Sequence, residues 1–201
     1  MKKIDTFSAN SLKILDRNLN EFKEKYIHNL SLLKKDNRAI LGQKFHSLIC
    51  FYINNFDISK MILELNEKEI KIWQNLENVL KDKKQNFIQT EFPFLIKEKL
   101  NNKNYYLTGR YDAIYKENDN YIIYDWKTLN LPSNPDEDLQ SIVYLYCASK
   151  IFKTNKIKMK YLSIEKLESS NVDFSYEEIY KKRIDKIIAK YNEYETEEIP
   201  F

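Results

Sequence analysis

Glycine is almost absent from this sequence, and its scarcity already limits the class of protein. The 201 residues include only two glycines, Gly42 and Gly109, whereas average usage would give about 14. Proline is also scarce, with four residues, while Lys, Asn, Ile, Tyr and Phe are abundant. A collagen-like chain and a Gly/Ser-rich linker are therefore excluded. A low-GC coding sequence accounts for the bias as a whole, but it does not explain why glycine persists at these two positions.

Cysteine and long apolar runs are scarce as well. The two cysteines, Cys50 and Cys147, are too few for a disulfide framework or for a metal site built from four cysteines. Both lie in apolar stretches, so we expect buried, reduced thiols. The N-terminal segment lacks the apolar core of a signal peptide, and no run reaches the length of a membrane span. We therefore expect a cytoplasmic protein that does not contact a membrane.

The charge and the apolar content place the chain among globular proteins. The net charge is +3, from 33 basic and 30 acidic residues, and such a balance neither indicates nor excludes a nucleic-acid partner. Hydrophobic residues make up 43% and aromatic residues 14% of the chain, which is enough for a packed core and argues against disorder. The length predicts a single domain over residues 1–201, mainly helical over 1–84, with the core and a terminal helix over 85–201.

The hydrophobic pattern changes along the chain from helical to strand-like. Helices are predicted where apolar residues recur every third or fourth position: residues 8–26, 38–54, 58–81 with a break near Asn66, 136–152 and 176–194. Strands are predicted where aromatic and β-branched residues dominate: residues 87–96, 105–115, 121–128 and 156–166. The polar run between the second and third strands suits a turn, so these two strands should form an antiparallel hairpin. This order predicts an α/β or α+β core that follows a helical segment.

Two carboxylates and a lysine in the predicted hairpin form the most informative constellation. Asp125 and Lys127 lie two positions apart in a strand and therefore share a face, with Trp126 on the other face. The paired strand can bring Asp112 close to Asp125. Two adjacent carboxylates repel each other, and a hard divalent cation such as Mg²⁺ or Mn²⁺ relieves the repulsion. Such a metal activates water and polarises a phosphoryl oxygen, while a lysine beside it holds the water and balances charge.

The acidic-x-Lys spacing taken alone has a simpler interpretation. The same spacing begins at Glu21, Glu69 and Asp82, on polar helical runs that suit solvent-exposed faces. The pair at Asp125 differs because it lies in an apolar strand, where burying a charge is costly. A purely structural ion pair is the alternative at that position.

Six short motifs extend the constellation along the chain. They are Phe7-Ser-Ala-Asn-Ser-Leu with Phe22 and Tyr26, Gly42-Gln-Lys-Phe-His46, Thr90-Glu91-Phe-Pro-Phe, Gly109-Arg-Tyr-Asp112, Asp125-Trp-Lys127-Thr128, and Gln140-Ser-Ile-Val-Tyr144. In this order the chain resembles the PD-(D/E)XK nuclease superfamily, and within it the RecB-type domain shared with CRISPR-associated and AddB-type exonucleases. The resemblance implies a restriction-endonuclease-like core, a small mixed sheet flanked by helices.

The resemblance also implies a role for each matching residue. His46, Asp112 and Asp125 would hold Mg²⁺ or Mn²⁺, with the Trp126 carbonyl as a further ligand, and Lys127 would activate or orient the attacking water. Gln140 and Tyr144 share one helical face and would border the active site. Gly42, Glu91 and Gly109 would support it.

Several of these residues also have structural interpretations. A lone histidine on an apolar helix, such as His46, is commonly a satisfied core residue. The sequence leaves two interpretations of Glu91: it supports the site, or it simply lies at a strand edge. Tyr144 is open between a site residue and a packing residue, and Trp126 is expected to pack in the core. Gly42 lies one helical turn before His46, where a missing side chain permits close approach, and Gly109 marks a bulge or a close backbone passage.

Partners and further cofactors are less well defined by the sequence. Many relatives carry four cysteines that hold an iron–sulfur cluster; no cysteine follows Cys147, so we expect no cluster here. Four lysines after the Gln140 helix are candidates for contact with DNA phosphates or for a solvated surface: Lys153, Lys156, Lys158 and Lys160. No helicase motor is recognisable, so work on long DNA would need a helicase or another repair or recombination protein.

Three functions follow from these observations. The favoured hypothesis is a metal-dependent DNA nuclease, an exonuclease or a nuclease of flaps and single-stranded ends, in repair, recombination or defence. The second is a nucleic-acid-binding or assembly module on the same fold with weak catalysis or none. The third is a structural domain in which the motif matches are accidental.

Overall fold

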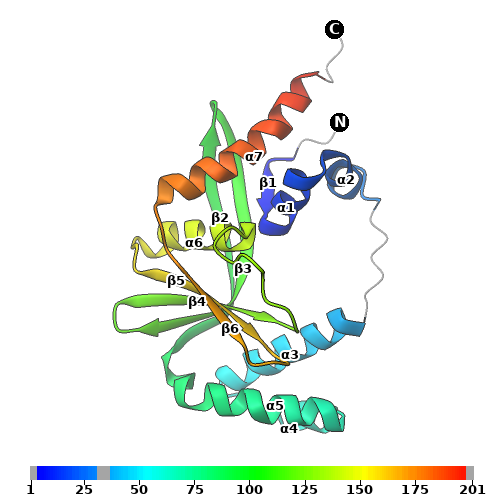
Figure 1. Cartoon of the computed structure of the whole chain (residues 1–201), viewed down its shortest axis with the longest axis vertical. Helices are drawn as coiled ribbons and strands as arrows, with labels where there is room; N and C mark the ends of the chain where they lie inside the picture. The colour runs from blue at the N-terminus through cyan, green and yellow to red at the C-terminus, as the bar shows by residue number, and fades with distance from the viewer. Residues whose placement is uncertain (1–3, 31–36, 198–201) are drawn as a thin grey trace.

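The structure, a computed structural model, describes residues 4–30 and 37–197 of the chain (Figure 1). Its strands are β1 (Thr6–Ser8), β2 (Phe87–Leu100), β3 (Lys103–Glu117), β4 (Asn120–Lys127), β5 (Ile157–Ser163) and β6 (Ser169–Asp173). Its α-helices are α1 (Ala9–Arg17), α2 (Leu19–Phe22), α3 (Asn37–Ile53), α4 (Ser59–Leu63), α5 (Glu67–Leu80), α6 (Leu139–Phe152) and α7 (Glu177–Glu197). A π-helical turn, η1 (Lys23–Ile27), and a 3₁₀ segment, η2 (Lys81–Asn86), follow α2 and α5.

Within the described residues, the six strands form one mixed sheet. The order along the sheet is β1-β3-β4-β5-β6, and β2 pairs with the long strand β3. The pairs β2–β3, β3–β4 and β5–β6 are antiparallel, whereas β1–β3 and β4–β5 are parallel. The predicted hairpin is confirmed as β3–β4, with Glu117 opposite Asn120. A second hairpin, β2–β3, turns at Asn101 and Asn102, whose φ angles of 47° and 63° suit a two-residue turn.

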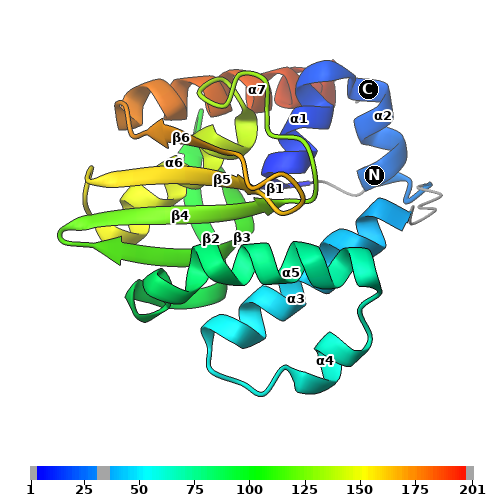
Figure 2. The same cartoon turned by 60° about the horizontal axis from the view of Figure 1, so that its bottom comes forward.

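Helices cover both faces of the sheet, and each face has its own apolar core (Figure 2). On one face, α1, α6 and α7 pack over side chains such as Tyr111 and Ile123. On the other face, α3 and α5 pack over Ala113, Tyr124 and Trp126. Alternation along β4 produces this division because successive strand side chains point to opposite faces. The predicted α/β class, with a small mixed sheet flanked by helices, is confirmed.

The first predicted helix, over residues 8–26, is interrupted in the structure. Phe7 lies in strand β1, and Ser8 is the N-cap of α1, where it exchanges hydrogen bonds with Ser11 in a capping box. Asn18 has an extended backbone, with φ −154°, and its side chain caps α2. Asparagine competes for backbone hydrogen bonds in this way and favours caps over helix interiors. Apolar spacing alone therefore merged three helical segments into one, and strand β1 just before them was not predicted.

Strand β6 was also not predicted from the sequence. Its residues, Ser169–Asp173, are mostly polar, and only Val172 is buried. Such a segment pairs because β5 offers an open edge, which is tertiary context rather than a local signal. The other predicted elements agree with the structure to within a few residues at their ends.

A gap in the pairing along β3 positions the functional residues. Strand β2 occupies one edge of β3 along nearly its whole length, so β1 and β4 share the other edge. Strand β1 pairs as far as Thr108, and β4 begins to pair at Ala113. Residues 109–112 lie between them, where β4 separates from β3 and continues beside β5. Among the described residues, no helix is both long and apolar enough to cross a membrane.

Candidate active site

Asp112 and Asp125 lie at the fork where β3 and β4 separate. The ladder ends with Ala113 opposite Tyr124, so one further step of the same register brings the two aspartates opposite each other. Asp112 Oδ2 accepts a hydrogen bond from the Trp126 backbone N–H at 2.7 Å, which ties the two strands together beyond the ladder. Both carboxylates are buried. The sequence prediction that the hairpin joins these two groups agrees with this geometry.

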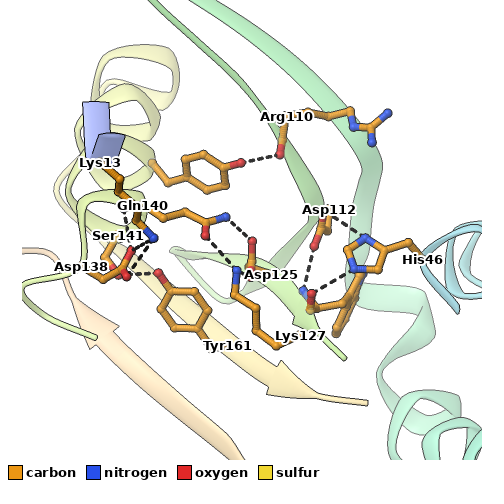
Figure 3. A network of polar contacts seen from close by, with 12 residues as sticks. Lys13, His46, Arg110, Asp112, Asp125, Lys127, Asp138, Gln140, Ser141 and Tyr161 are labelled. Atoms are coloured by element: carbon orange, nitrogen blue, oxygen red, sulfur yellow. Dashed lines mark hydrogen bonds and ion pairs between the residues drawn. The ribbon is translucent and has the colours of Figure 1, made fainter. Parts of the chain in front are cut away.

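Asp125, Lys127 and Gln140 form a closed triangle of polar contacts (Figure 3). Lys127 Nζ lies 2.8 Å from Asp125 Oδ2 and donates a hydrogen bond to Gln140 Oε1 at 2.8 Å. Gln140 Nε2 donates in turn to Asp125 Oδ1. The amide of Gln140 thus contacts both members of the Asp-x-Lys pair with its two ends. The lysine ammonium is held at the fork and does not extend freely into solvent.

His46 reaches the same fork from the opposite face of the sheet. It lies on α3, and its Nε2 is 2.9 Å from the Trp126 carbonyl oxygen, which can only accept, so the ring nitrogen donates. Its Nδ1 lies 3.5 Å from Asp112 Oδ1. Burial lowers the pKa of His46, but the hydrogen bond and charge of Asp112 outweigh it, and the net pKa is raised. The Trp126 carbonyl, predicted as a metal ligand, is thus in contact with His46.

Glu91 joins this cluster from β2. The side chains of His46, Glu91 and Asp112 each offer one ligand atom, and these atoms lie within 4.8 Å of one another. Glu91 also forms an ion pair with Arg110, in which Glu91 Oε2 lies 2.7 Å from Arg110 Nε. A pocket of about 580 Å³ opens beside these residues, and its lining includes His46, Glu91, Arg110 and Thr128.

The electrostatics of Asp125 favour a further positive charge beside its carboxylate. Burial and the neighbouring charge of Asp112 raise the pKa of Asp125 to about 6, although Lys127 and His46 act in the opposite direction. Asp125 Oδ2 is buried, and Lys127 Nζ, 2.8 Å away, is in ionic contact with it. One ammonium group beside two neighbouring carboxylates offsets their repulsion only in part. Oxygen and imidazole donors are ligands that suit a divalent metal, so these residues fit the predicted Mg²⁺ or Mn²⁺.

Tyr144 and Trp126 stabilise the fork in different ways. The Tyr144 hydroxyl donates to the Arg110 carbonyl oxygen at 3.0 Å, in the part of β3 that pairs with β2 but with neither β1 nor β4. Tyr111 donates its hydroxyl to the Tyr144 carbonyl at 3.1 Å, which links β3 to α6. The Trp126 ring packs against Tyr124 in the core beneath α3 and α5, with ring centroids 5.0 Å apart. Tyr144 therefore contacts the edge of β3 between its pairings with β1 and β4. Burial and the charges of Asp125 and Asp112 raise the pKa of the Tyr144 hydroxyl.

Each glycine lies where another element approaches its backbone. A Cβ at Gly42 would be 2.7 Å from Thr128 Oγ1, so α3 passes directly beneath the end of β4. A Cβ at Gly109 would overlap the Phe94 ring, 2.8 Å from its Cε1 and 3.2 Å from Tyr144 Cε1. Neither glycine has a positive φ. Close approach, and not an unusual backbone conformation, is the feature that requires glycine here.

Of the four lysines proposed to contact DNA, three lie away from the fork, and Lys160 lies opposite Tyr124, on the face of the sheet away from Asp125. Strand β5 is parallel to β4 with Tyr121 opposite Ile157, so Lys156 and Lys158 flank the start of β4, while Asp125 is near its end. Lys156 pairs with Asp119 at 3.2 Å and Lys158 with Asp173 at 2.9 Å. Lys153 ends α6 with a left-handed backbone, and Lys160 lies over the Tyr124 ring at 5.8 Å. The structure does not bring these lysines together with the carboxylates.

Three polar residues near the site were not identified from the sequence. Lys13 on α1 contacts the Asp138 carboxylate at 2.9 Å, and Asp138 caps α6 by accepting the Gln140 backbone N–H at 2.7 Å. Arg110 lies inside the Gly109-Arg-Tyr-Asp112 motif, so its place beside the site was readable from that motif. Lys13 carried no local signal, because only the fold brings α1 to the start of α6. A second, smaller pocket of about 170 Å³ includes Lys13, Gln140 and Tyr144 in its lining.

Comparisons with known proteins agree with this arrangement. The sequence profile of the PD-(D/E)XK nuclease superfamily matches residues 6–200. Among solved structures, the chain is similar to one titled "Crystal structure of SSO0001", with 20% sequence identity, a TM-score of 0.51, and coverage of 94% of this chain and 78% of that chain. Curated proteins gave no match. The structural similarity shows a shared fold, and the family match extends over nearly the whole chain. The chain belongs to the PD-(D/E)XK nuclease superfamily.

Proposed function

We propose that this protein is a metal-dependent deoxyribonuclease that hydrolyses phosphodiester bonds at single-stranded DNA ends or flaps. The observation that carries the proposal is the convergence of His46, Asp112, Asp125 and Lys127 on one fork in the sheet. Three different elements supply these groups, so their meeting depends on the fold as a whole. A purely structural ion pair between Asp125 and Lys127 would not require the histidine and the second carboxylate beside it.

The residues at the fork have distinct roles in this proposal. His46, Asp112 and Asp125 hold Mg²⁺ or Mn²⁺, which supplies Lewis-acid polarisation of the phosphate and a more acidic water when bound. Lys127 Nζ lies within hydrogen-bonding reach of Asp125 and Gln140, and it holds the attacking water and balances the charge of the transition state. Gln140 keeps the ammonium in place, because its amide contacts both Lys127 and Asp125.

The choice of DNA ends as substrate rests on the resemblance to RecB-type exonucleases and on the shape of the site. Two pockets flank the fork, one lined by residues of α3 and one by residues of α1 and α6, and in this proposal a single strand lies along them. On long duplexes a helicase or another repair or recombination protein would supply the single strand. In this proposal Lys153, Lys156, Lys158 and Lys160 bind DNA away from the scissile phosphate, farther along the strand.

A cleavage assay on end-labelled DNA and RNA tests this proposal. Single-stranded, flapped and blunt duplex substrates are incubated with Mg²⁺, with Mn²⁺ and with EDTA. We expect cleavage of single-stranded DNA with metal and none with EDTA, and loss of cleavage in Lys127→Ala. The matched control is Lys71→Ala, which removes an exposed lysine from α5 and should retain activity.

Other outcomes would identify a different function. DNA binding without cleavage under any divalent metal would favour a binding or assembly module on this fold. Cleavage that survives both Lys127→Ala and chelation would contradict the proposed mechanism. Preferential cleavage of RNA would correct the substrate while leaving the metal site intact.

A further inference from the structure

Glu91 has an unusual place in β2. Its neighbours pair regularly with β3, Thr90 with Ala113 and Phe92 with Tyr111, so Glu91 lies opposite Asp112. Its φ angle is 52°, in the left-handed region that a non-glycine residue rarely adopts within a strand. Directly opposed residues in an antiparallel pair lie side by side. The Glu91 carboxylate therefore lies beside the Asp112 carboxylate at the fork.

The distances around Glu91 suit direct coordination of a metal. One ligand atom from each of His46, Glu91 and Asp112 lies within 4.8 Å of the others. Bonds from oxygen or nitrogen ligands to a divalent cation span about 2.0–2.6 Å, so two ligands on opposite sides of one ion lie up to about 5 Å apart. Asp125 is buried at the same fork beside Asp112, and a divalent cation offsets the repulsion between two neighbouring carboxylates.

Arg110 is bound to the Glu91 carboxylate, the same group that would bind a metal ion. Its Nε lies 2.7 Å from Glu91 Oε2, and its side chain is 62% exposed, whereas the Glu91 side chain is 27% exposed. A guanidinium and a divalent ion that share one carboxylate repel each other as like charges. The ion pair itself stays near the solvent, where such pairs contribute little to folding. Its main consequence is therefore expected at the metal site.

We propose that Glu91 is an additional metal ligand, beside His46 and Asp112, and that the Arg110 ion pair weakens metal binding by competing for Glu91. Metal binding then draws the Glu91 carboxylate away from Arg110 and releases the guanidinium. This inference rests on the proposed metal-dependent function, and it adds a ligand and a residue that tunes the affinity of the site.

The affinity for Mn²⁺, measured without DNA by electron paramagnetic resonance or calorimetry on the full chain, tests the proposal. We expect Glu91→Gln to weaken Mn²⁺ binding about tenfold or more, on the scale of the losses found when groups that support metal sites are removed. Arg110→Ala should tighten binding several-fold in the wild-type background. In the Glu91→Gln background, the same Arg110→Ala change should have little effect on Mn²⁺ affinity, because the carboxylate for which Arg110 and the metal compete is gone.

Matched controls separate direct contact from a change in net charge. Glu177→Gln and Arg183→Ala alter the charge equally at residues of α7, which pair with Lys150 and Asp16, and they should leave Mn²⁺ affinity unchanged. Thermal unfolding in EDTA checks that each variant folds. Should a variant fail to fold, Glu91→Asp replaces Glu91→Gln and Arg110→Lys replaces Arg110→Ala. Glu91→Asp keeps the charge on a shorter arm and should weaken binding; Arg110→Lys keeps the charge without the planar geometry and should tighten it slightly.

The failure of this inference differs from the failure of the proposed function. If Glu91→Gln binds Mn²⁺ as the wild type does while Asp112→Asn loses binding, the metal site stands and Glu91 is not a ligand. Equal effects of Arg110→Ala in both backgrounds would likewise overturn the competition. If the wild-type protein binds no Mn²⁺ at all, the proposed metal-dependent function is itself wrong.

Discussion

The ammonium group of Lys13 lies 2.9 Å from the carboxylate of Asp138, although 125 positions separate them in the sequence. Asp138 caps α6 through the backbone N–H of Gln140, and the Gln140 side chain contacts Lys127. Figure 3 shows these groups in one continuous network that ends at Asp125. The first helix of the chain is therefore connected to the proposed catalytic lysine through one ion pair and two hydrogen bonds.

This network predicts that Lys13 positions the catalytic lysine from a distance. Lys13→Met should lower kcat about three- to tenfold, on the scale of a partly buried ion pair worth about 1 kcal/mol, with KM for DNA nearly unchanged. Asp138→Asn keeps an oxygen for the helix cap and should match Lys13→Met, whereas Asp138→Ala should cost more. Steady-state kinetics on a short single strand measure these effects.

Two comparisons make the Lys13 prediction specific. Lys13→Arg restores the charge and should recover most of kcat, while Lys156→Met removes a lysine from an exposed pair with Asp119 and should change nothing. A rise in KM with unchanged kcat would instead mean that Lys13 contacts the substrate directly from the pocket that it lines.

Asp125 is predicted to destabilise the metal-free fold. Burial and Asp112 raise its pKa from the ordinary 3.8 to about 6 in the folded protein. As the pH rises, the unfolded chain therefore loses this proton at a lower pH than the folded protein does. The free energy of unfolding falls as the pH rises between these two values. Above that range, Asp125→Asn should increase the free energy of unfolding by roughly 1–3 kcal/mol. Urea denaturation in EDTA at pH 7.5 and pH 4.5 should show the gain at the higher pH and little of it at the lower.

Metal should reverse the order of stability of the wild type and Asp125→Asn. Mn²⁺ should stabilise the wild type and not Asp125→Asn, because the ion binds the carboxylate and offsets its repulsion with Asp112. Asp119→Asn, at an exposed position, serves as the control and should not respond to either pH or metal. A wild type that is more stable than Asp125→Asn at pH 7.5 in EDTA would contradict the prediction.

The two glycines should respond differently to alanine. Gly109→Ala places a methyl group inside the Phe94 ring, and overpacking of this kind costs about 1–3 kcal/mol. Gly42→Ala brings its Cβ to 2.7 Å from a single atom, Thr128 Oγ1, and a helical alanine returns about 0.5–1 kcal/mol, so its net cost in stability should be smaller than that of Gly109→Ala. Thermal denaturation compares the two variants.

A second substitution identifies the cause of the Gly109 effect. Phe94→Leu removes the ring atoms that the new Cβ would meet, so Gly109→Ala should cost less in that background than in the wild type. Purely additive losses would show that the methyl group disturbs something other than the Phe94 ring.

The two cysteines should differ sharply in reactivity. Cys147 is fully buried in α6, and burial, reinforced by the charge of Glu98, raises the pKa of its thiol. Cys50 is partly exposed beside the larger pocket. Because the thiolate is the reactive form, a thiol reagent at pH 8 should modify Cys50 in the native protein and reach Cys147 only after denaturation. Mass spectrometry of the labelled peptides measures both, and rapid native labelling of Cys147 would contradict the burial.

The order of the elements and the Asp-x-Lys pair could be read from the sequence because they depend on local patterns. Alternation placed Asp125 and Lys127 on one face of β4 and Trp126 on the other, as the core confirms. The hairpin that carries Asp112 followed from the polar turn between two apolar strands. Strands β1 and β6 did not follow, because short or polar segments become strands only where a neighbouring edge accepts their hydrogen bonds.

The fold itself decided what surrounds that pair. Sequence motifs named His46 and Glu91, but only the packing of α3 and β2 against the fork brought them within coordinating distance of Asp112. Lys13 carried no signal at all, since its partner Asp138 lies on a helix that meets α1 only in the folded chain. Spacing along the chain determines which side chains share a face of one helix or strand, whereas a metal site needs ligands from several elements. Their distances are set by how the layers pack.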